Sequence, residues 1–328
     1  MSPRVSVVLP VYNAMPYLDE AMASVLGQSL EDFELIAIND GSTDGSAACL
    51  RSWAERDGRV RLVDRENRGL VATLNEGIGL ARAALIARMD GDDVCEPLRL
   101  ERQVEYLEGH PEVVACGSQA VIIDERGWSY SLSRFPQEHE ALEAALLKGQ
   151  CLVLHPSVMM RTGVVRGLGG YRAGLAEGER VDLCEDLDLW LRITERHRMV
   201  NLEQRLIRYR KHTGSITSRL KAAQHACSVR VLREACEARG LDAGPVIAGM
   251  SALETRVLTP DRLAAEAFRA GFGGVGWRYV WMGLWGGPRW ASAKQAVVRV
   301  LGRRVCQALG RYKARLLGRG ADGQGAGC

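Results

Sequence analysis

The sequence lacks the glycine-rich loops by which two large classes of enzyme bind phosphate groups. Tyr12 and Asn13 follow the first apolar run, Val5–Val11, where a G-x-G-x-x-G dinucleotide fingerprint would stand. No G-x-x-x-x-G-K-[ST] phosphate loop occurs in the chain. We therefore do not expect a dehydrogenase or an ordinary ATPase.

Long apolar runs and metal-type cysteine spacings are also missing. No stretch has the roughly 20 apolar residues that a membrane-spanning helix needs. The first residues lead straight into a predicted strand, so we expect no signal peptide. The nine cysteines show no C-x-x-C and no His/Cys zinc spacing, and we interpret them as reduced thiols. These features predict a cytoplasmic protein.

Acidic residues are absent from one stretch near the carboxyl end. Residues 267–321 carry eleven Lys or Arg and no Asp or Glu, whereas the net charge of the whole chain is only +3. The rest of the chain is therefore mildly acidic. A basic segment on an acidic body indicates contact with something anionic.

The spacing of apolar residues predicts alternating strands and helices in the first half. We predict strands at 5–11, 33–38, 60–63 and 84–87, and helices at 16–29, 47–56 and 69–82. This alternation is typical of an α/β fold with a Rossmann-like, mostly parallel central sheet that is covered on both faces.

Three carboxylates follow the fourth predicted strand within four positions: Asp90, Asp92 and Asp93. Carboxylates this close repel one another unless a cation lies among them, and their hard oxygens suit Mg²⁺ or Mn²⁺. Gly91 permits a tight turn and leaves room for a ligand. A solvated acidic turn is the alternative. The carboxyl edge of an open α/β sheet, where ligands bind, favours the cation site.

Side chains at the ends of the other predicted strands suit a nucleoside. Tyr12 can stack on a base, Asp40 can accept hydrogen bonds from a base or a ribose, and Arg68 can meet a phosphate. Each has a structural alternative: core packing, a turn residue and a solvated helix entry, respectively. We predict nucleotide binding because all three are expected at one edge of one sheet.

Two long segments carry a resemblance to a known enzyme family. They are PVYNAMPYLDEAMASVLGQSLEDFELIAINDGSTDGS and ENRGLVATLNEGIGLARAALIARMDGDD. Together they resemble family 2 glycosyltransferases of the GT-A type, over residues 3–216 or so. The resemblance implies the GT-A nucleotide-diphospho-sugar transferase fold and an enzyme of bacterial surface-polysaccharide type.

The resemblance also implies roles for individual residues. The nucleotide of a nucleotide-sugar donor would lie on the first half of the sheet, with a D-x-D pair holding a divalent ion at its diphosphate. Nucleotide contacts are thereby implied for Pro10, Tyr12, Asp40, Arg68 and Asp90, metal binding for Asp92, and a supporting role for Asp93.

Glu185 and Asp186 begin a further predicted helix, where the helix dipole favours carboxylates. That stabilising position is the structural alternative to catalysis. The pair resembles the family's ED motif. We predict that Asp186 is the general base that takes the proton of the acceptor hydroxyl. Glu185 and Trp190 are predicted to shape the acceptor pocket around it.

Two shorter segments complete the predicted site. Leu206–Ser215 resembles the family's Y-R-x-H-x-x-S segment, in which His212 would complete the metal's coordination and Arg210 would neutralise phosphate. A basic surface loop is the alternative. His155 lies in an HPS segment similar to that of these enzymes and is predicted at the acceptor side, with a structural role as the alternative. Residues 172–184 form a long acidic segment, predicted to be a mobile lid.

The carboxyl-terminal part is predicted to be a helical appendage. The predicted domains are a catalytic domain at 1–216, divided near residue 117 into nucleotide-sugar and acceptor halves, a basic aromatic-rich appendage at 217–317 and a disordered tail at 318–328. A basic amphipathic helix at 293–317 suits an anionic membrane surface. Docking on the catalytic domain or on a partner subunit is the alternative. Nucleic acid is not expected as a partner, since no RNA-binding fold is visible.

We therefore predict an inverting, metal-dependent glycosyltransferase, cytoplasmic and peripheral on the inner face of the membrane. It would move a sugar from a UDP-sugar to a hydroxyl of a glycan or lipid-linked acceptor. The Q-x-x-R-W motif of processive synthases is absent, which favours one sugar per encounter. A sugar nucleotidyltransferase and a catalytically silent, membrane-associated nucleotide-binding protein are the alternatives. A homo-oligomer is left open.

Overall fold

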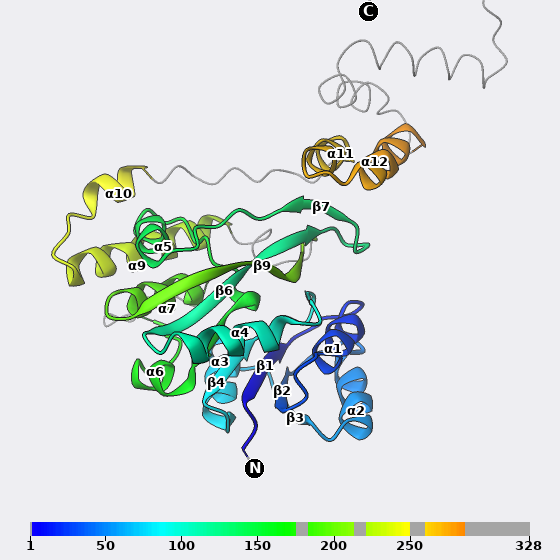
Figure 1. Ribbon diagram of the computed structural model, residues 1–328, viewed down its shortest axis with the longest axis horizontal. Helices are drawn as coiled ribbons and strands as arrows, with labels where there is room; N and C mark the ends of the chain where they lie inside the picture. Colours follow the sequence, from blue (N-terminus) through cyan, green and yellow to red (C-terminus); the bar gives the residue numbers. More distant parts are fainter. Residues whose placement is uncertain (1, 175–182, 213–220, 250–259, 286–328) are drawn as a thin grey trace, which may run out of the picture. The chain divides into compact units, whose positions relative to one another are not determined.

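The computed structural model describes residues 2–174, 183–212, 221–249 and 260–285 of the chain (Figure 1). Its contacts divide the chain into two compact units. Unit 1 comprises Met1–Glu125 and Leu132–Thr255, and unit 2 comprises Arg126–Ser131 and Arg256–Cys328. The domain boundaries derived from the sequence, with an appendage that starts at residue 217, stay a prediction.

A mostly parallel sheet forms the centre of unit 1, as the sequence predicted. Its strands lie in the spatial order β3-β2-β1-β4-β8-β6-β9-β5. In chain order they are β1 (Val5–Val11), β2 (Phe33–Asp40), β3 (Val60–Arg65), β4 (Leu85–Arg88), β5 (Val94–Cys95), β6 (Val113–Ile123), β8 (Met159–Arg161) and β9 (Arg198–Arg210); β7 (Ser129–Leu132) is a further short strand.

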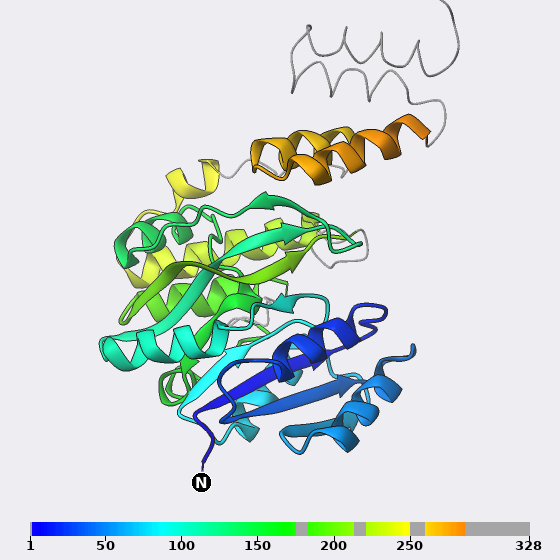
Figure 2. The same cartoon turned by 45° about the vertical axis from the view of Figure 1, so that its right-hand side comes forward.

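Helices pack along these strands (Figure 2). In unit 1 they are α1 (Leu18–Leu26), α2 (Ser46–Arg56), α3 (Leu70–Leu80), α4 (Arg99–Gly109), α5 (His139–Leu146), α6 (Thr162–Gly167), α7 (Glu185–Thr194), α9 (Lys221–Ala238) and α10 (Gly244–Gly249). A single 3₁₀ turn, His155–Ser157, precedes β8. The predicted α/β class is therefore confirmed.

Strand β1 lies at the point where the strand order reverses. It pairs in parallel with β2 on one side and with β4 on the other, and every one of its residues is buried, as a strand covered on both faces requires. Its register with β4 ends at Val8 and Arg88. Pro10, which has no N–H to donate, therefore lies beyond that pairing. Such a switch point opens a ligand crevice at the carboxyl ends of the strands.

Helix α3 packs closely against β1. A Cβ atom on Gly77 would lie 2.4 Å from Val8 Cγ1, so only glycine allows this approach. Leu74 and Ile78 of the same helix are buried in the core of unit 1. The close packing fixes α3, whose first turn adjoins the carboxyl end of β2, relative to the switch point.

Strands β6 and β9 form the second half of the sheet, paired in parallel along most of their length. β8 is antiparallel to β4 and β6, and β5 is antiparallel to β9. β6 is a single strand in which polar residues stand between two apolar runs, Val113–Cys116 and Ala120–Ile123. The polar residues between them are accommodated because Gln119 Oε1 accepts hydrogen bonds from Ser133 Oγ (2.8 Å) and the Phe135 N–H (2.9 Å).

A disulfide between Cys184 and Cys227 links the start of α7 to α9. Both residues are buried, at 4% and 2% exposure. The prediction that all cysteines are reduced thiols is therefore wrong for this pair. Their separation of 43 residues leaves no local spacing pattern by which the sequence could reveal them.

Unit 2 contains a pair of helices, α11 (Pro260–Arg269) and α12 (Gly273–Trp285). They pack edge to face through Phe268 and Trp277, whose ring centroids are 5.5 Å apart. Within the same unit, the Arg278 guanidinium lies 5.2 Å from the ring of Trp128.

The basic helix predicted at 293–317 and the predicted tail at 318–328 lie outside the described residues. Within the described part of the chain, every helix is too short or too polar to cross a bilayer.

Candidate active site

The loops that follow β1 and β2 interlock at the switch point. The Asn13 N–H donates to Ser42 Oγ (3.0 Å), and the Thr43 N–H donates to Asn13 Oδ1 (2.8 Å). Asn13 has a φ of 50°, a left-handed conformation that Asn tolerates. Tyr12 remains 55% exposed next to this junction. Its ring is available for stacking, so core packing does not account for it.

Asp40 ends β2 and holds the start of α3. Its buried carboxylate pairs with Arg65 and accepts the backbone N–H groups of Arg68 (2.8 Å) and Gly69 (3.0 Å). A carboxylate has about four acceptor positions, so one is left for a ligand. The Arg68 side chain is exposed at this point. The structure therefore brings two predicted nucleotide residues together.

The three carboxylates after β4 form a compact group. Asp90, Asp92 and Asp93 each offer one oxygen, and these oxygens lie within 4.8 Å of one another. A Cβ atom on Gly91 would lie 3.0 Å from the Cβ of Ala14, so glycine lets this turn approach the loop after β1. The predicted cation ligands are thus adjacent to the predicted nucleoside contacts.

Asp93 is the buried member of this group. Its Oδ1 accepts the Arg210 N–H (2.7 Å), whereas its buried Oδ2 has no hydrogen-bond partner among the described residues. Burial raises the pKa of Asp93 well above its ordinary value, and the charges of Asp92 and Asp90 raise it further. A divalent cation would satisfy such an orphaned oxygen and relieve the repulsion. The donor set therefore fits Mg²⁺ or Mn²⁺.

The end of β9 closes over the acidic turn. His212 Nε2 lies 2.9 Å from Asp92 Oδ2. Arg210 donates to the Asp92 carbonyl (2.7 Å) and to Glu20 (2.5 Å), and its guanidinium lies 4.5 Å from the Tyr17 ring. Most N–H groups of the Arg210 side chain therefore donate hydrogen bonds within the protein. The predicted contact of Arg210 with a phosphate stays a prediction.

Glu185 and Asp186 begin α7, as predicted. Asp186 Oδ1 accepts the Leu187 N–H (2.7 Å), and the Cys151 thiol donates to Asp186 Oδ2 (3.7 Å). Burial raises the pKa of Asp186, while Leu187 and the Arg88 charge oppose the rise. Burial and the charge of Asp186 raise the pKa of Glu185 to about 8. The hydrogen bond from the Leu187 N–H favours the charged form of Asp186.

His155 supports these acids from the core. Its Nε2 lies 2.7 Å from the Tyr171 hydroxyl, its Nδ1 lies 3.9 Å from Glu185 Oε1, and its ring meets Trp190 edge-on at 5.8 Å. Burial lowers the pKa of His155 well below its ordinary value, so the imidazole is neutral. Trp190 is fully buried and packs against His155, and its role in shaping the acceptor pocket stays a prediction.

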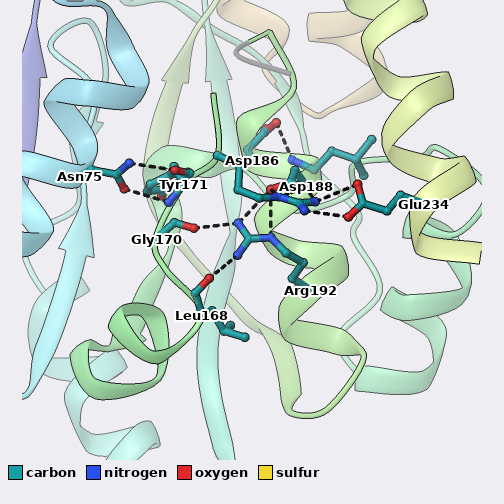
Figure 3. A network of polar contacts seen from close by, with 10 residues as sticks. Asn75, Leu168, Gly170, Tyr171, Asp186, Asp188, Arg192 and Glu234 are labelled. Carbon is teal, nitrogen blue, oxygen red and sulfur yellow. Dashed lines mark hydrogen bonds and ion pairs between the residues drawn. The ribbon is translucent and has the colours of Figure 1, made fainter. Parts of the chain in front are cut away.

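A polar network joins α7 to the segments on either side of it (Figure 3). The buried Asp188 carboxylate pairs with Arg172 and accepts hydrogen bonds from Arg192 (3.0 and 2.8 Å). Arg172 also pairs with Glu234 of α9 (2.7 Å), and Arg192 donates to two carbonyl groups of the turn that precedes Tyr171. The helix that presents Asp186 is thereby tied to its surroundings at several points.

Three residues with contacts in this site were not predicted from the sequence. Arg88 pairs with Asp90, Tyr171 bonds His155, and Cys151 bonds Asp186. Only Arg88 carried a signal, as a charged residue inside an apolar strand. Most of the predicted lid, residues 175–182, lies outside the described residues.

Comparison with known proteins identifies the family. The sequence model of Glycosyl transferase family 2 matches residues 6–168. The O-antigen biosynthesis glycosyltransferase WbnJ of Escherichia coli is 34% identical over 235 residues, which cover 70% of this chain and 88% of the relative. This chain belongs to glycosyltransferase family 2. The amylovoran biosynthesis glycosyltransferase AmsE of Erwinia amylovora is 31% identical over 219 residues, covering 65% and 79%.

Solved structures show the same fold. TarS 1–349 of S. aureus, in complex with UDP-GlcNAc, has a TM-score of 0.55 at 17% identity and covers 96% of this chain and 85% of its own. The mannosyltransferase PcManGT of Pyrobaculum calidifontis, in complex with GDP-Man and Mn²⁺, has a TM-score of 0.50 at 17% identity, covering 96% and 81%. The predicted GT-A fold and transferase activity are confirmed.

Proposed function

We propose that this glycosyltransferase moves one sugar per encounter, with inversion, from a UDP-sugar to a hydroxyl of a glycan or lipid-linked acceptor. The observation that carries the proposal is the group of three carboxylate oxygens within 4.8 Å of one another, with His212 bound to Asp92. This group lies at the switch point, where α/β folds bind nucleotides.

The donor half of the proposal assigns Tyr12, Pro10, Asp40 and Arg68 to the nucleoside and Asp90 to the ribose. Asp92 and His212 would hold Mg²⁺ or Mn²⁺, with Asp93 as support. When bound, the ion would supply positive charge to the diphosphate leaving group. The exposed Tyr12 ring and the remaining acceptor position of Asp40 support the nucleoside assignment.

The acceptor half of the proposal assigns the proton transfer to Asp186. As the acceptor hydroxyl attacks the anomeric carbon, its proton passes to an Asp186 oxygen and the bond from the anomeric carbon to the diphosphate breaks. A single displacement inverts the anomeric configuration, so an α-linked donor gives a β-linked product. The Leu187 N–H donates to Asp186 and favours its carboxylate form, which supports the assignment of Asp186 as the base.

The cellular setting is also part of the proposal. Two relatives carry names of surface-polysaccharide assembly, O-antigen and amylovoran biosynthesis, which supports a similar pathway class here. Residues 267–321 carry eleven basic and no acidic residues, which supports peripheral binding to an anionic membrane surface on the cytoplasmic side.

Titration calorimetry tests the donor half. We expect UDP to bind in the presence of Mn²⁺, GDP and ADP to bind more weakly, and binding to be lost with EDTA. Asp92→Asn should weaken UDP binding with Mn²⁺ by about tenfold or more, which is about 1.4 kcal/mol or more. Asp32→Asn, at an exposed acid before β2, is the matched control and should bind as the wild type does.

Absence of nucleotide binding under every condition would contradict the proposed function. Binding that is equally tight with EDTA would contradict the metal assignment and leave the transferase assignment in place. Preference for GDP over UDP would change the donor class alone.

A further inference from the structure

Tyr171 lies in the turn after α6, and its backbone is bound to helix α3 (Figure 3). Its N–H donates to Asn75 Oδ1 (2.9 Å), and its carbonyl accepts a hydrogen bond from Asn75 Nδ2 (2.8 Å). Gly170 permits this approach, because it has a φ of 70° and a Cβ atom there would lie 2.4 Å from Asn75 Oδ1. One side chain of α3 therefore satisfies both backbone polar groups of Tyr171.

The same turn is also bound to helix α7. The Arg192 guanidinium donates to the carbonyl groups of Leu168 (2.9 Å) and Gly170 (2.7 Å). Tyr171 is thus held between α3, which starts at the predicted nucleotide residues, and α7, which presents the proposed base.

The side chain of Tyr171 reaches His155 from this fixed position. Both residues are buried, and the Tyr171 hydroxyl lies 2.7 Å from His155 Nε2. Within the described part of the chain, this is the hydrogen bond that the hydroxyl group makes. A buried hydroxyl proton without an acceptor is costly, so the hydroxyl is the donor and Nε2 is the acceptor.

This hydrogen bond selects the tautomer of His155. The imidazole is neutral, because burial lowers the pKa of His155 well below its ordinary value. A neutral imidazole carries one proton, and an Nε2 atom that accepts a hydrogen bond leaves that proton on Nδ1. Nδ1 lies 3.9 Å from Glu185 Oε1, and the edge-on contact with Trp190 restricts rotation of the ring. The N–H therefore faces the carboxyl group of Glu185.

We propose that Tyr171 is a positioning residue for the acceptor side of the site: its hydroxyl fixes the Nδ1–H tautomer of His155 and thereby directs an N–H towards Glu185, next to the proposed base. The inference rests on the proposed function, because Glu185 and Asp186 are the acceptor-side acids of that proposal. Asn75 supports the same role from α3.

Nitrogen NMR of the imidazole rings tests the tautomer without turnover. Protonated and unprotonated ring nitrogens have well-separated ¹⁵N chemical shifts, which are measured in ¹⁵N-histidine-labelled protein at about pH 8, where an ordinary histidine is neutral. His155→Gln identifies the His155 signals among the six histidines. We expect a protonated Nδ1 and an unprotonated Nε2 in the wild type. In Tyr171→Phe, Nε2 loses its hydrogen-bond donor, so signals of the Nε2–H tautomer should appear.

Tyr106→Phe is the matched control. Tyr106 also adjoins a histidine, because its ring centroid lies 4.1 Å from that of His110. His110 Nδ1, however, contacts the Tyr106 carbonyl (2.8 Å) and not its hydroxyl. Removing this hydroxyl should leave the His155 signals and the catalytic readout unchanged.

Donor hydrolysis, with water in place of the acceptor hydroxyl, provides the catalytic readout. The wild type is screened with UDP-glucose, UDP-galactose and UDP-GlcNAc, each with Mn²⁺, and the donor that it hydrolyses fastest is used. Attack by water breaks the bond from the anomeric carbon to the diphosphate and yields UDP and free sugar, while the proton of the water passes to the base. We expect kcat for hydrolysis to fall about tenfold in Tyr171→Phe, the effect of one lost hydrogen bond. Calorimetric affinity for UDP with Mn²⁺ should change by less than about twofold.

The outcomes are distinguishable. An Nε2–H tautomer in the wild type, or unchanged His155 signals in Tyr171→Phe, would overturn the inference alone. A Tyr171→Phe variant with a lower Tm but wild-type hydrolysis would show a purely structural tyrosine and would also overturn it. A wild-type protein that neither binds UDP nor hydrolyses any of the three donors would overturn the proposed function and the inference with it. If Tyr171→Phe does not fold, Asn75→Asp, which loses the N–H donor to the Tyr171 carbonyl, is measured under the same criteria.

Discussion

Glu185 and Asp186 are adjacent in sequence, yet their carboxyl groups have different surroundings. Asp186 accepts a backbone N–H and a thiol, and both bonds favour a carboxylate acceptor. Glu185 faces a neutral imidazole and has a pKa raised to about 8, chiefly by burial. Burial therefore favours the protonated form of Glu185, whereas two hydrogen-bond donors favour the charged form of Asp186.

At this scale we predict that Asp186→Asn lowers kcat for transfer by about 10²–10⁴-fold, because a positioned general base contributes that much. The amide oxygen can still accept the Leu187 N–H, so the fold of α7 should survive. Steady-state kinetics together with UDP calorimetry would measure the effect, and UDP affinity with Mn²⁺ should change by less than about twofold. Near-full turnover of the variant would show that the base lies elsewhere.

The residues that could be predicted from the sequence are those that stand in short ordered motifs. Asp90 and Asp92 belong to this class because they follow an apolar run that indicates a strand end, and Asp186 belongs to it because Glu185-Asp186 resembles the family's ED motif. Tyr171 and Cys151 could not be predicted, since each meets its partner only through the folding of distant segments. Even for the predicted residues, the ionisation state depends on burial, which the sequence does not display.

At the scale of elements, α7 depends on α9 for its position. The disulfide between Cys184 and Cys227 links the first turn of α7 to α9, and the pairing of Arg172 with Asp188 and Glu234 links the two helices again further along. Part of the region predicted as an appendage, residues 221–249, therefore belongs to unit 1 and supports the candidate catalytic helix.

We predict that reducing this disulfide destabilises unit 1. Closing a loop with a sequence separation of 43 residues restricts the unfolded chain, which is worth about 2–4 kcal/mol. Dithiothreitol should lower Tm by roughly 5–15 °C in scanning calorimetry. Cys227→Ser should have the lower Tm without reductant and show no further response to it. Cys49→Ser, which removes a free thiol, should keep the full response. A wild-type Tm that is insensitive to reductant would contradict the prediction.

The elements that the sequence revealed are those with an uninterrupted apolar pattern. β1, with seven buried residues, was predicted with its observed bounds. β9 was missed over most of its length because Glu203, Gln204 and Arg205 are exposed within it. Its 13 residues form a strand because β6 pairs alongside, and that pairing is a long-range contact.

At the scale of the whole molecule, the buried acids of the candidate site lower the free energy of unfolding as pH rises. Asp93 and Glu185 are buried acids whose pKa values are raised in the folded state by burial and by neighbouring charges. The stabilising contribution of such a group is complete only at a pH below its pKa in the unfolded chain. It is lost as the pH rises through the pKa of the group in the folded protein. The free energy of unfolding should therefore contain a component that falls as the solution becomes more alkaline.

For Glu185, this fall should occupy the window from its ordinary pKa near 4.5 up to about pH 8. Glu185→Gln replaces the titrating group by a neutral one, so its Tm should decline less than that of the wild type between pH 5 and pH 8. Glu112→Gln, at an exposed acid before β6, is the matched control and should follow the wild-type slope. Thermal unfolding across this pH range measures all three proteins. A residual slope in Glu185→Gln is expected from Asp93. A slope identical to that of the wild type would mean that Glu185 titrates as an ordinary glutamate, which would contradict the prediction.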